Sequence, residues 1–83
     1  MRIVWDEPKR LANLDKHEID LREVTEDFIN DGKLYPAKLG RIAVVGMHKG
    51  HLMTAIVEPL GSEAVAVISF RDASRKERRQ FWS

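Results

Sequence analysis

The stretch that ends the sequence holds its densest group of side chains that could do chemistry. Five cationic residues fall within nine positions: Arg71, Arg75, Lys76, Arg78 and Arg79. Guanidinium and ammonium groups at this density are typical of a site that binds a polyanion through its phosphate groups. Arg78 has two alternative roles, since it could stack on Trp82 or pair with Asp72.

The segment that carries these cations opens with a helix-capping pattern. Ser74 and Glu77 have the Ser-x-x-Glu spacing of a capping box, in which each residue binds the backbone N–H of the other. The spacing predicts a short C-terminal helix, and it explains Glu77 as a cap rather than as a catalytic group. An apolar strand predicted over Glu63–Phe70 runs into this helix, so that Ser69 and Arg71 share one face of a sheet.

A second polar group lies near the N-terminus, on a predicted helix that Asp6 caps and that carries Pro8 in its first turn. The helical period separates polar and apolar residues onto two sides: Lys9, Asn13, Lys16 and His17 against Leu11 and Leu14. An imidazole takes up and releases a proton near neutral pH, which makes His17 a candidate proton carrier. The structural alternative is that His17 ends the helix and hydrogen-bonds a backbone carbonyl near the helix C-terminus. Asn13 has a structural alternative as a cap or bridge, and Trp5 is expected in the core.

Size and composition exclude several classes of protein. The chain has 83 residues and no cysteine, which excludes disulfides and thiolate metal sites. The histidines show no metal-binding spacing, and we expect His48 and His51, beside a Lys-Gly turn, to be solvated. There is no long apolar run and no signal-like N-terminus, so we expect one cytoplasmic domain over residues 1–83 without a membrane partner.

Charge is divided unevenly along the chain. Residues 1–31 hold five Lys or Arg and nine Asp or Glu, a balance of −4, whereas residues 32–83 hold nine against four, a balance of +5. The net charge of +1 therefore conceals a basic surface suited to an acidic partner. The alternative is ordinary solvated charge, and the clustering near the C-terminus favours the basic surface.

The hydrophobic pattern predicts an α+β fold with two N-terminal helices on a small antiparallel sheet and a short C-terminal helix. Strands are predicted over Arg2–Trp5, Arg41–Met47, Leu52–Pro59 and Glu63–Phe70, the last three joined by glycine-containing turns. The second helix is predicted from a capping pattern at Asp20 and Glu23 to the stop signal Asn30-Asp31-Gly32, with an apolar stripe of Leu21, Val24 and Phe28. Tyr35-Pro36 is predicted to be a loop.

Two motifs in a fixed order lead to a resemblance that spans nearly the whole chain. The first comprises Trp5-Asp6, Lys9, Asn13 and Lys16-His17-Glu18, which is similar to the pattern W-D-x-x-K-x-x-x-N-x-x-K-H-G. The second is similar to I-S-A-R-x-A-S/T-R-x-E-R-x-x-Y and reads Ile68-Ser69-Phe70-Arg71-Asp72-Ala73-Ser74-Arg75-Lys76-Glu77-Arg78-Arg79-Gln80-Phe81. Both patterns belong to the BrnT family, the toxin halves of bacterial type II toxin–antitoxin pairs, which the chain therefore resembles.

The resemblance implies a RelE-like fold and a metal-independent endoribonuclease that inhibits translation by cleaving RNA, with no cofactor. It also implies a cognate BrnA-like antitoxin, a small DNA-binding protein that blocks the toxin and represses the shared operon. Operator DNA would then be contacted only through the antitoxin.

Cleavage of RNA without metal needs a base, cations that hold the charge on the phosphate, and an acid for the leaving oxygen. We assign the phosphate charge to Lys16, Arg71 and Arg75, and proton transfer to His17. The candidate RNA-binding residues are Lys9, Arg41, Lys76, Arg78 and Arg79. Together they predict a basic cleft formed by the first helix, the sheet face and the C-terminal helix.

Three departures from the family pattern stand in the sequence. Glu18 replaces a Gly that would end the first helix in the left-handed region, Phe70 replaces an Ala near the presumed site, and the usual terminal Tyr hydroxyl is missing. A catalytically weakened homologue that acts as an antitoxin- or RNA-binding module is therefore the alternative function. A plain RNA-binding domain is a weaker alternative, because the chain shows no RRM or KH signature.

Overall fold

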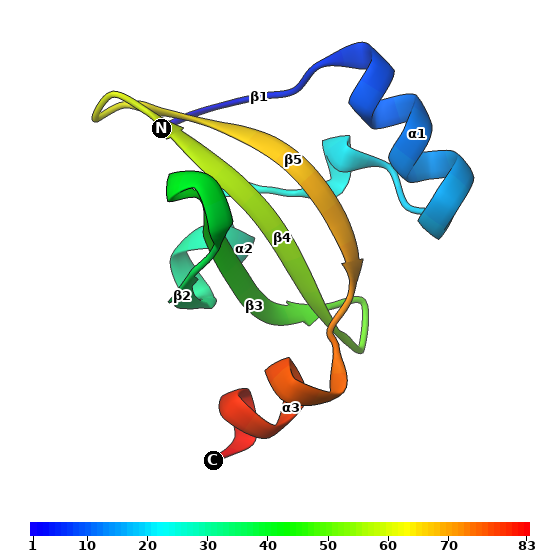
Figure 1. Ribbon diagram of the computed structural model, residues 1–83, viewed down its shortest axis with the longest axis vertical. Coiled ribbons are helices and arrows are strands. Elements are labelled where there is room, and N and C mark those ends of the chain that lie inside the picture. The colour runs from blue at the N-terminus through cyan, green and yellow to red at the C-terminus, as the bar shows by residue number, and fades with distance from the viewer.

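The computed structural model describes residues 1–83 and is organised around one five-stranded sheet (Figure 1). The strands are β1 (Arg2–Val4), β2 (Lys33–Pro36), β3 (Ile42–His48), β4 (His51–Leu60) and β5 (Ala64–Asp72). The helices are α1 (Glu7–His17), α2 (Glu26–Asp31) and α3 (Arg75–Trp82), with single 3-10 turns η1 (Leu21–Glu23) and η2 (Lys38–Gly40). The predicted α+β class, the central three strands and the C-terminal helix are confirmed.

The sheet is mixed, and the prediction of an antiparallel sheet is wrong in this respect. The strand order is β1-β5-β4-β3-β2, in which β2 to β5 form an antiparallel meander and β1 pairs with β5 in parallel. A parallel pair needs a long crossover connection, so no local turn signal in the sequence indicates it. The predicted loop at Tyr35-Pro36 is also wrong, because both residues belong to β2. This strand lies at the sheet edge, where a proline without an N–H is tolerated.

Residues 20–31 do not form the predicted single helix. The Asp20 carboxylate accepts from the Arg22 N–H at 2.9 Å and closes only the η1 turn. Val24 is extended, and Thr25 then caps α2 by accepting from the Phe28 N–H at 3.1 Å. The Thr25 side chain thus competes with helix continuation by binding the backbone itself. The predicted apolar stripe is nevertheless buried, comprising Leu21, Val24 and Phe28.

α1 has nearly the predicted bounds, but it faces the sheet with its polar side. Asn13 is only 6% exposed, whereas Leu11 is 54% exposed. Trp5, expected in the core, is 40% exposed. Glu18 ends the helix in the left-handed region at φ 60° and ψ 26°, the conformation for which the family pattern uses Gly.

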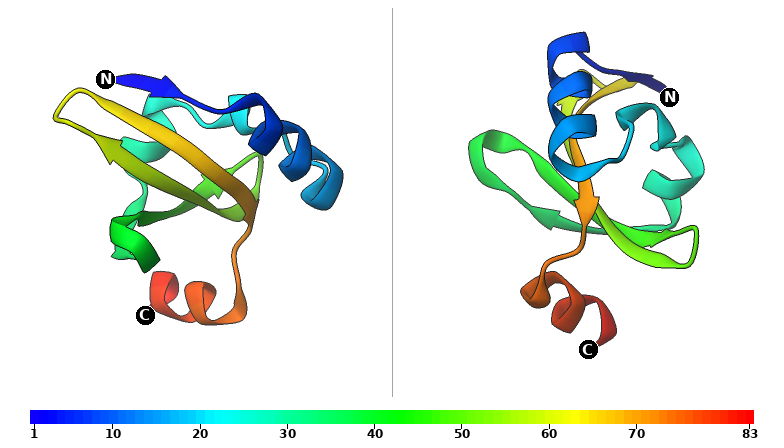
Figure 2. Two further views of the ribbon diagram at one scale, coloured as in Figure 1. Left: turned by 45° about the horizontal axis from the view of Figure 1, so that its top comes forward. Right: turned by 90° about the vertical axis from the view of Figure 1, so that its right-hand side faces the viewer.

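Apolar side chains pack on both faces of the sheet. The larger cluster lies under η1 and α2 and includes the fully buried Leu21, Val44, Val67 and Phe70. The smaller cluster lies under α3 and contains Val45, Leu52 and Ala73, with Tyr35 and Phe81 packed against it. Figure 2 shows α3 at the bottom of both views, away from α1.

Phe70 belongs to the larger cluster, so the expectation that its ring lies near the presumed site is wrong. The ring packs edge-on against Phe28 and His48, with centroid distances of 5.2 Å to each. Successive strand residues point to opposite faces, which places Phe70 on the face opposite Arg71. The larger side chain fills the core and leaves the face of Arg71 open.

Candidate functional site

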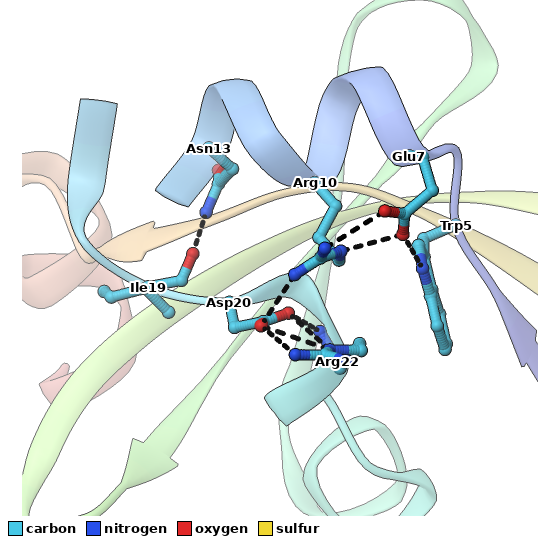
Figure 3. A network of polar contacts seen from close by, with 7 residues as sticks. All are labelled: Trp5, Glu7, Arg10, Asn13, Ile19, Asp20 and Arg22. Atoms are coloured by element: carbon cyan, nitrogen blue, oxygen red, sulfur yellow. Dashed lines mark hydrogen bonds and ion pairs between the residues drawn. The ribbon is translucent and has the colours of Figure 1, made fainter. Parts of the chain in front are cut away.

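α1 is fixed at the open edge of β5 by the side chain of Asn13. β1 pairs only with residues 64–66 of β5, which leaves the second half of that strand edge without a strand partner. Asn13 Oδ1 accepts from the Phe70 N–H at 3.1 Å, and Nδ2 donates to the Phe70 carbonyl at 2.8 Å. Nδ2 also donates to the Ile19 carbonyl at 2.8 Å (Figure 3). The alternative role of Asn13 as a bridge is therefore the correct one.

A network of ion pairs fixes the N-terminal half of α1 (Figure 3). Arg10 donates to Glu7 at 2.8 and 3.0 Å and to Asp20 at 3.0 Å. Hydrogen bonds from the side chain and backbone of Arg22 lower the pKa of Asp20 to about 2. The Trp5 indole N–H donates to Glu7 at 3.0 Å. These bonds tie α1 to η1 and thereby set the position of its other side chains along β5.

The first of two basic hollows lies between α1 and β5, and we call it the α1 hollow. Its volume is about 190 Å³, and it is lined by Lys9, Ala12, Asn13, Lys16, His17, Ile68 and Ser69. The structure thus brings the two candidate lysines and His17 together. Lys16 forms no ion pair, and Lys9 approaches only Asp6, at 3.8 Å. Ser69 Oγ donates to Asn13 Oδ1 at 3.2 Å, so this serine is held by the same asparagine.

The second, the Arg41 hollow, lies on the sheet face beside α3. Its volume is about 360 Å³, and its lining is Pro36, Ala37, Lys38, Arg41, Ala43, Ile56, Arg71 and Glu77. The η2 turn brings Lys38 and Arg41 to one side, because the Arg41 N–H donates to the Lys38 carbonyl at 3.1 Å. Arg71 enters from β5, so cations from two distant parts of the sequence line one hollow together with the Glu77 carboxylate.

Arg71 forms a bidentate ion pair with Glu77 in this hollow. Nη1 and Nη2 donate to Oε1 and Oε2 at 2.7 and 3.0 Å. The carboxylate also accepts from the Ser74 N–H at 2.7 Å and from the Thr54 hydroxyl at 2.8 Å. Burial raises the pKa of Glu77, but the bonds from Arg71, Ser74 and Thr54 outweigh it and lower the pKa to about 2. The capping box is confirmed, and Glu77 has a second role that the sequence does not indicate.

Arg41 carries an unsatisfied donor. Its Nε is buried and has no hydrogen-bond partner, and the nearest carboxylate oxygen, from Glu58, lies 3.8 Å away. A buried donor without a partner is uncommon in folded proteins, and at a binding site it indicates a place for an acceptor. An anion in the Arg41 hollow would supply that acceptor.

The two hollows adjoin on one face of the sheet, but they do not form the single cleft that the sequence predicts. Ser69 lines the α1 hollow, and its cross-strand partner Ile56 lines the Arg41 hollow. Ser69 and Arg71 are two residues apart on β5 and lie on the same face, so their Cα atoms are about 7 Å apart. α1 and α3 themselves stand at opposite ends of the molecule (Figure 1).

The remaining cations of α3 lie outside these two hollows. Lys76 borders a third hollow with Tyr35 and Gln80, which shares Pro36, Ala43 and Glu77 with the Arg41 hollow. The other three occupy positions i, i+3 and i+4 and form an outward stripe that continues to Trp82, comprising Arg75, Arg78 and Arg79. None of them forms an ion pair, and the two alternative partners of Arg78 are not used: Trp82 packs against Phe81 instead, and Asp72 is not paired.

The rest of the molecule offers no second site of comparable character. The largest hollow, of about 830 Å³, surrounds the β4–β5 turn and the N-terminus, where Arg2 is the single Lys or Arg in its lining. No cluster of three His, Cys, Asp or Glu side chains is arranged to hold a metal ion. None of the helices has the length and apolar character needed to cross a membrane.

Sequence reasoning missed two contributors to this region, Lys38 and Thr54, and it misjudged His48 on the opposite face of the sheet. Lys38 follows a segment predicted as loop, and Thr54 is an ordinary strand residue whose register opposite Arg71 is visible only in the structure. His48, expected to be solvated, is partly buried and lies 2.9 Å from Glu23. The carboxylate that the sequence assigns to a helix cap thus binds the β3–β4 corner instead. Only His51 is exposed as predicted.

Comparison with known proteins places this geometry in a family. Residues 5–77 match the family described as the ribonuclease toxin, BrnT, of type II toxin–antitoxin systems. The chain belongs to the BrnT family. The crystal structure of the Brucella abortus ribonuclease toxin BrnT is similar, with 41% sequence identity and a TM-score of 0.83 over 90% of this chain and 99% of that one. A search of curated proteins found no match. The predicted resemblance to BrnT is confirmed, and membership implies an antitoxin as partner.

Proposed function

We propose that this BrnT-family protein is a metal-independent endoribonuclease that inhibits translation by cleaving RNA and is neutralised by a cognate BrnA-like antitoxin. The observation that carries the proposal is the Arg41 hollow, where Arg41, Lys38 and Arg71 meet and one buried guanidinium donor lacks an acceptor. A phosphodiester supplies the missing acceptor and the negative charge.

The reaction requires a ribose 2′-oxygen to attack the neighbouring phosphorus. The O2′–P bond forms as the P–O5′ bond breaks, the 2′-hydroxyl proton passes to a base, and the leaving O5′ receives a proton. His17 is the proposed proton carrier, with Lys16 beside it to hold charge on the phosphate. Arg41 and Arg71 stabilise the charge that grows on the non-bridging oxygens.

The support for Arg75 differs from that for Arg71. Arg75 begins α3, and the N-terminus of a helix can bind a phosphate through its free backbone N–H groups. Glu77 and Ser74 already satisfy N–H groups of the first turn. Phosphate binding therefore rests on side-chain cations, and Arg75 takes part from the outward stripe of α3.

The outward stripe and the lysines extend the proposed RNA contact beyond the reacting phosphate. Arg75, Arg78 and Arg79 offer unpaired guanidinium groups, while Lys9 and Lys76 flank the sheet face at either end. Such contacts bind the backbone without reading sequence, and RNA affinity should fall linearly with the logarithm of salt concentration. Operator DNA is proposed to be reached only through the antitoxin.

One observation favours the alternative of a catalytically weakened homologue that binds antitoxin or RNA. The proposed catalytic Arg71 is ion-paired with Glu77, which offsets its charge. Two departures from the family pattern do not add to this alternative, since Glu18 adopts the conformation of the replaced Gly and Phe70 lies in the core.

Toxicity and cleavage test the proposal together. Expression without the neighbouring antitoxin gene should arrest growth, co-expression should restore it, and purified protein should cleave RNA in the presence of EDTA. Arg41→Ala and Arg71→Ala should abolish both effects without changing the circular dichroism spectrum. Arg2→Ala, which removes a cation at the far end of the molecule, should leave both intact. Full toxicity of the Arg41 and Arg71 variants would exclude the Arg41 hollow as the active site.

A further inference from the structure

The carboxylate of Glu77 is held by more bonds than a helix cap requires. In a capping box the glutamate carboxylate needs only the contact with the N-cap N–H, here that of Ser74, which is present at 2.7 Å. Glu77 also binds both terminal nitrogens of Arg71 and accepts from Thr54, a residue of β4 that is fully buried. Thr54 lies directly opposite Arg71 in the β4–β5 register, so strand, carboxylate and guanidinium form one connected unit.

The hydrogen bonds of Arg71 leave one edge of its guanidinium free. The planar group has five N–H donors. Glu77 takes one each from Nη1 and Nη2, and the Asp72 carbonyl takes the second from Nη1, at 3.2 Å. The two donors that remain, on Nε and Nη2, lie on the same edge and can bind two oxygens of one phosphate.

We propose that Glu77, anchored by Thr54, is a positioning residue that aims this free edge of Arg71 into the Arg41 hollow. There Arg71 and the unpartnered Nε of Arg41 together hold the oxygens of one RNA phosphate. The ion pair with Glu77 therefore orders Arg71 for binding instead of withdrawing it. This inference rests on the proposed function of the same hollow.

The physical advantage is orientation. A free arginine side chain has many rotamers, and immobilising it on binding costs conformational entropy. In this structure Glu77 and the Asp72 carbonyl restrain Arg71 before any ligand arrives. The Thr54 hydroxyl in turn restrains the carboxylate from the sheet, independently of the helix. Misplacing a catalytic group by about 1 Å can cost about 100-fold in rate, which sets the scale of the expected effect.

Two substitutions separate positioning from capping. Glu77→Gln keeps a residue that serves at this place in a capping box, but it removes the charge that binds Arg71. Thr54→Val keeps the shape of a buried strand residue and removes the anchoring hydroxyl. We expect RNA cleavage to fall about 100-fold in the first and about tenfold in the second, chiefly in kcat. Ser74→Ala is the matched control, since it weakens the cap while retaining the carboxylate and its backbone donor, and cleavage per folded molecule should stay at the wild-type level.

A double-mutant cycle tests whether Glu77 acts through Arg71. Arg71→Lys removes the planar fork, so adding Glu77→Gln to it should lower cleavage by less than about twofold more. If Glu77→Gln lowers cleavage by the same factor in both backgrounds, Glu77 acts through the fold and the proposal is overturned. Wild-type cleavage by both Glu77→Gln and Thr54→Val would also overturn it.

A second readout keeps the inference testable if the wild-type protein cleaves no RNA. That outcome would contradict the proposed function but not the positioning role of Glu77. The Arg71 Nε–Hε signal in nitrogen–proton NMR spectra should shift when inorganic phosphate is added to the wild-type protein. In Glu77→Gln the same titration should need about tenfold more phosphate. A wild-type signal that does not respond to phosphate, or an equal response in the variant, would exclude the positioning role.

Discussion

The side-chain amide of Asn13 pairs with both backbone polar groups of Phe70, as a neighbouring strand would. The two bonds measure 3.1 Å to the Phe70 nitrogen and 2.8 Å to its oxygen, and Asn13 is almost fully buried. A helix residue thus completes the hydrogen bonding of a sheet edge. The same contact turns the polar side of α1 towards β5 and places Lys16 and His17 beside Ser69.

Asn13→Ala should therefore destabilise the fold more than a typical polar substitution. The variant leaves the buried N–H and carbonyl of Phe70 unsatisfied, and we expect a loss of about 2 to 3 kcal/mol in the free energy of unfolding. Urea unfolding followed by circular dichroism measures the loss. Asn30→Ala, at an exposed position of α2, is the control and should change stability little. Equal stabilities for the two variants would show that the Asn13 hydrogen bonds make no net contribution to the free energy of unfolding.

How far the sequence predicts this fold depends on whether a signal is local. The Ser74–Glu77 box and the glycine turns of the meander are local, and the structure confirms them. The helix expected over residues 20–31 is broken because Thr25 caps a new helix. This cap is also a local signal, but the apolar stripe that runs across it favours one continuous helix. The burial of Asn13 against the edge of β5 has no such local signal, because that edge lies more than fifty residues later and helical periodicity cannot reveal that it needs a hydrogen-bond partner.

Glu18→Gly should stabilise the protein. Glu18 has φ 60°, where a side chain with Cβ costs about 1 to 2 kcal/mol and glycine costs none. Glycine loses somewhat more backbone entropy on folding, so the expected net gain is about 0.5 to 1 kcal/mol. The melting temperature reports the change. Asp15→Gly removes the same charge inside the same helix, where glycine is unfavourable, and should instead destabilise. A lower melting temperature for Glu18→Gly would contradict the assigned strain.

Glu77 should make stability fall in acid. Its pKa in the folded protein is about 2, below the ordinary value of 4.5, so its contribution is present above pH 4.5 and is lost as the pH falls towards 2. A difference of this size corresponds to on the order of 3 kcal/mol for a side chain that is 16% exposed. Asp20, Glu7 and Glu23 also have lowered pKa values, so the wild-type protein alone does not isolate Glu77.

The comparison with Glu77→Gln isolates that contribution. Unfolding free energies of both proteins, measured from neutral pH down to the lowest pH at which they fold, should converge as the pH falls below 4.5. Curves that stay parallel across this range would show that the Glu77 carboxylate is not bound in the folded state as the structure has it.

The candidate site was predictable in its residue types and not in its arrangement. Arg71 and Arg41 stand out as cations in the sequence, but their meeting depends on the register of β3, β4 and β5 and on the η2 turn. The pairing of Arg71 with Glu77 was hidden because the capping spacing explained the glutamate completely. The outward stripe of α3 could have been recognised from the spacing of Arg75, Arg78 and Arg79 alone, since those positions share one side of a helix.

His17 gives the most direct test of the proposed chemistry. In the α1 hollow it is half-buried beside Lys16 and Ser69, and it makes no hydrogen bond within the protein that would assign it a structural role. His17→Gln keeps a polar side chain of similar reach and removes the ability to transfer a proton. We expect RNA cleavage near neutral pH to fall by about 100-fold or more, as loss of general acid–base catalysis does, with an unchanged circular dichroism spectrum.

The pH profile of cleavage distinguishes proton transfer from simple binding. Wild-type kcat should depend on pH if His17 transfers a proton, and the residual activity of His17→Gln should not follow that dependence. His51→Gln, at an exposed position beside the β3–β4 turn, should keep both the rate and the profile of the wild type. A His17→Gln protein that cleaves RNA at the wild-type rate from mildly acid to mildly alkaline pH would leave the reaction to the lysines and arginines alone.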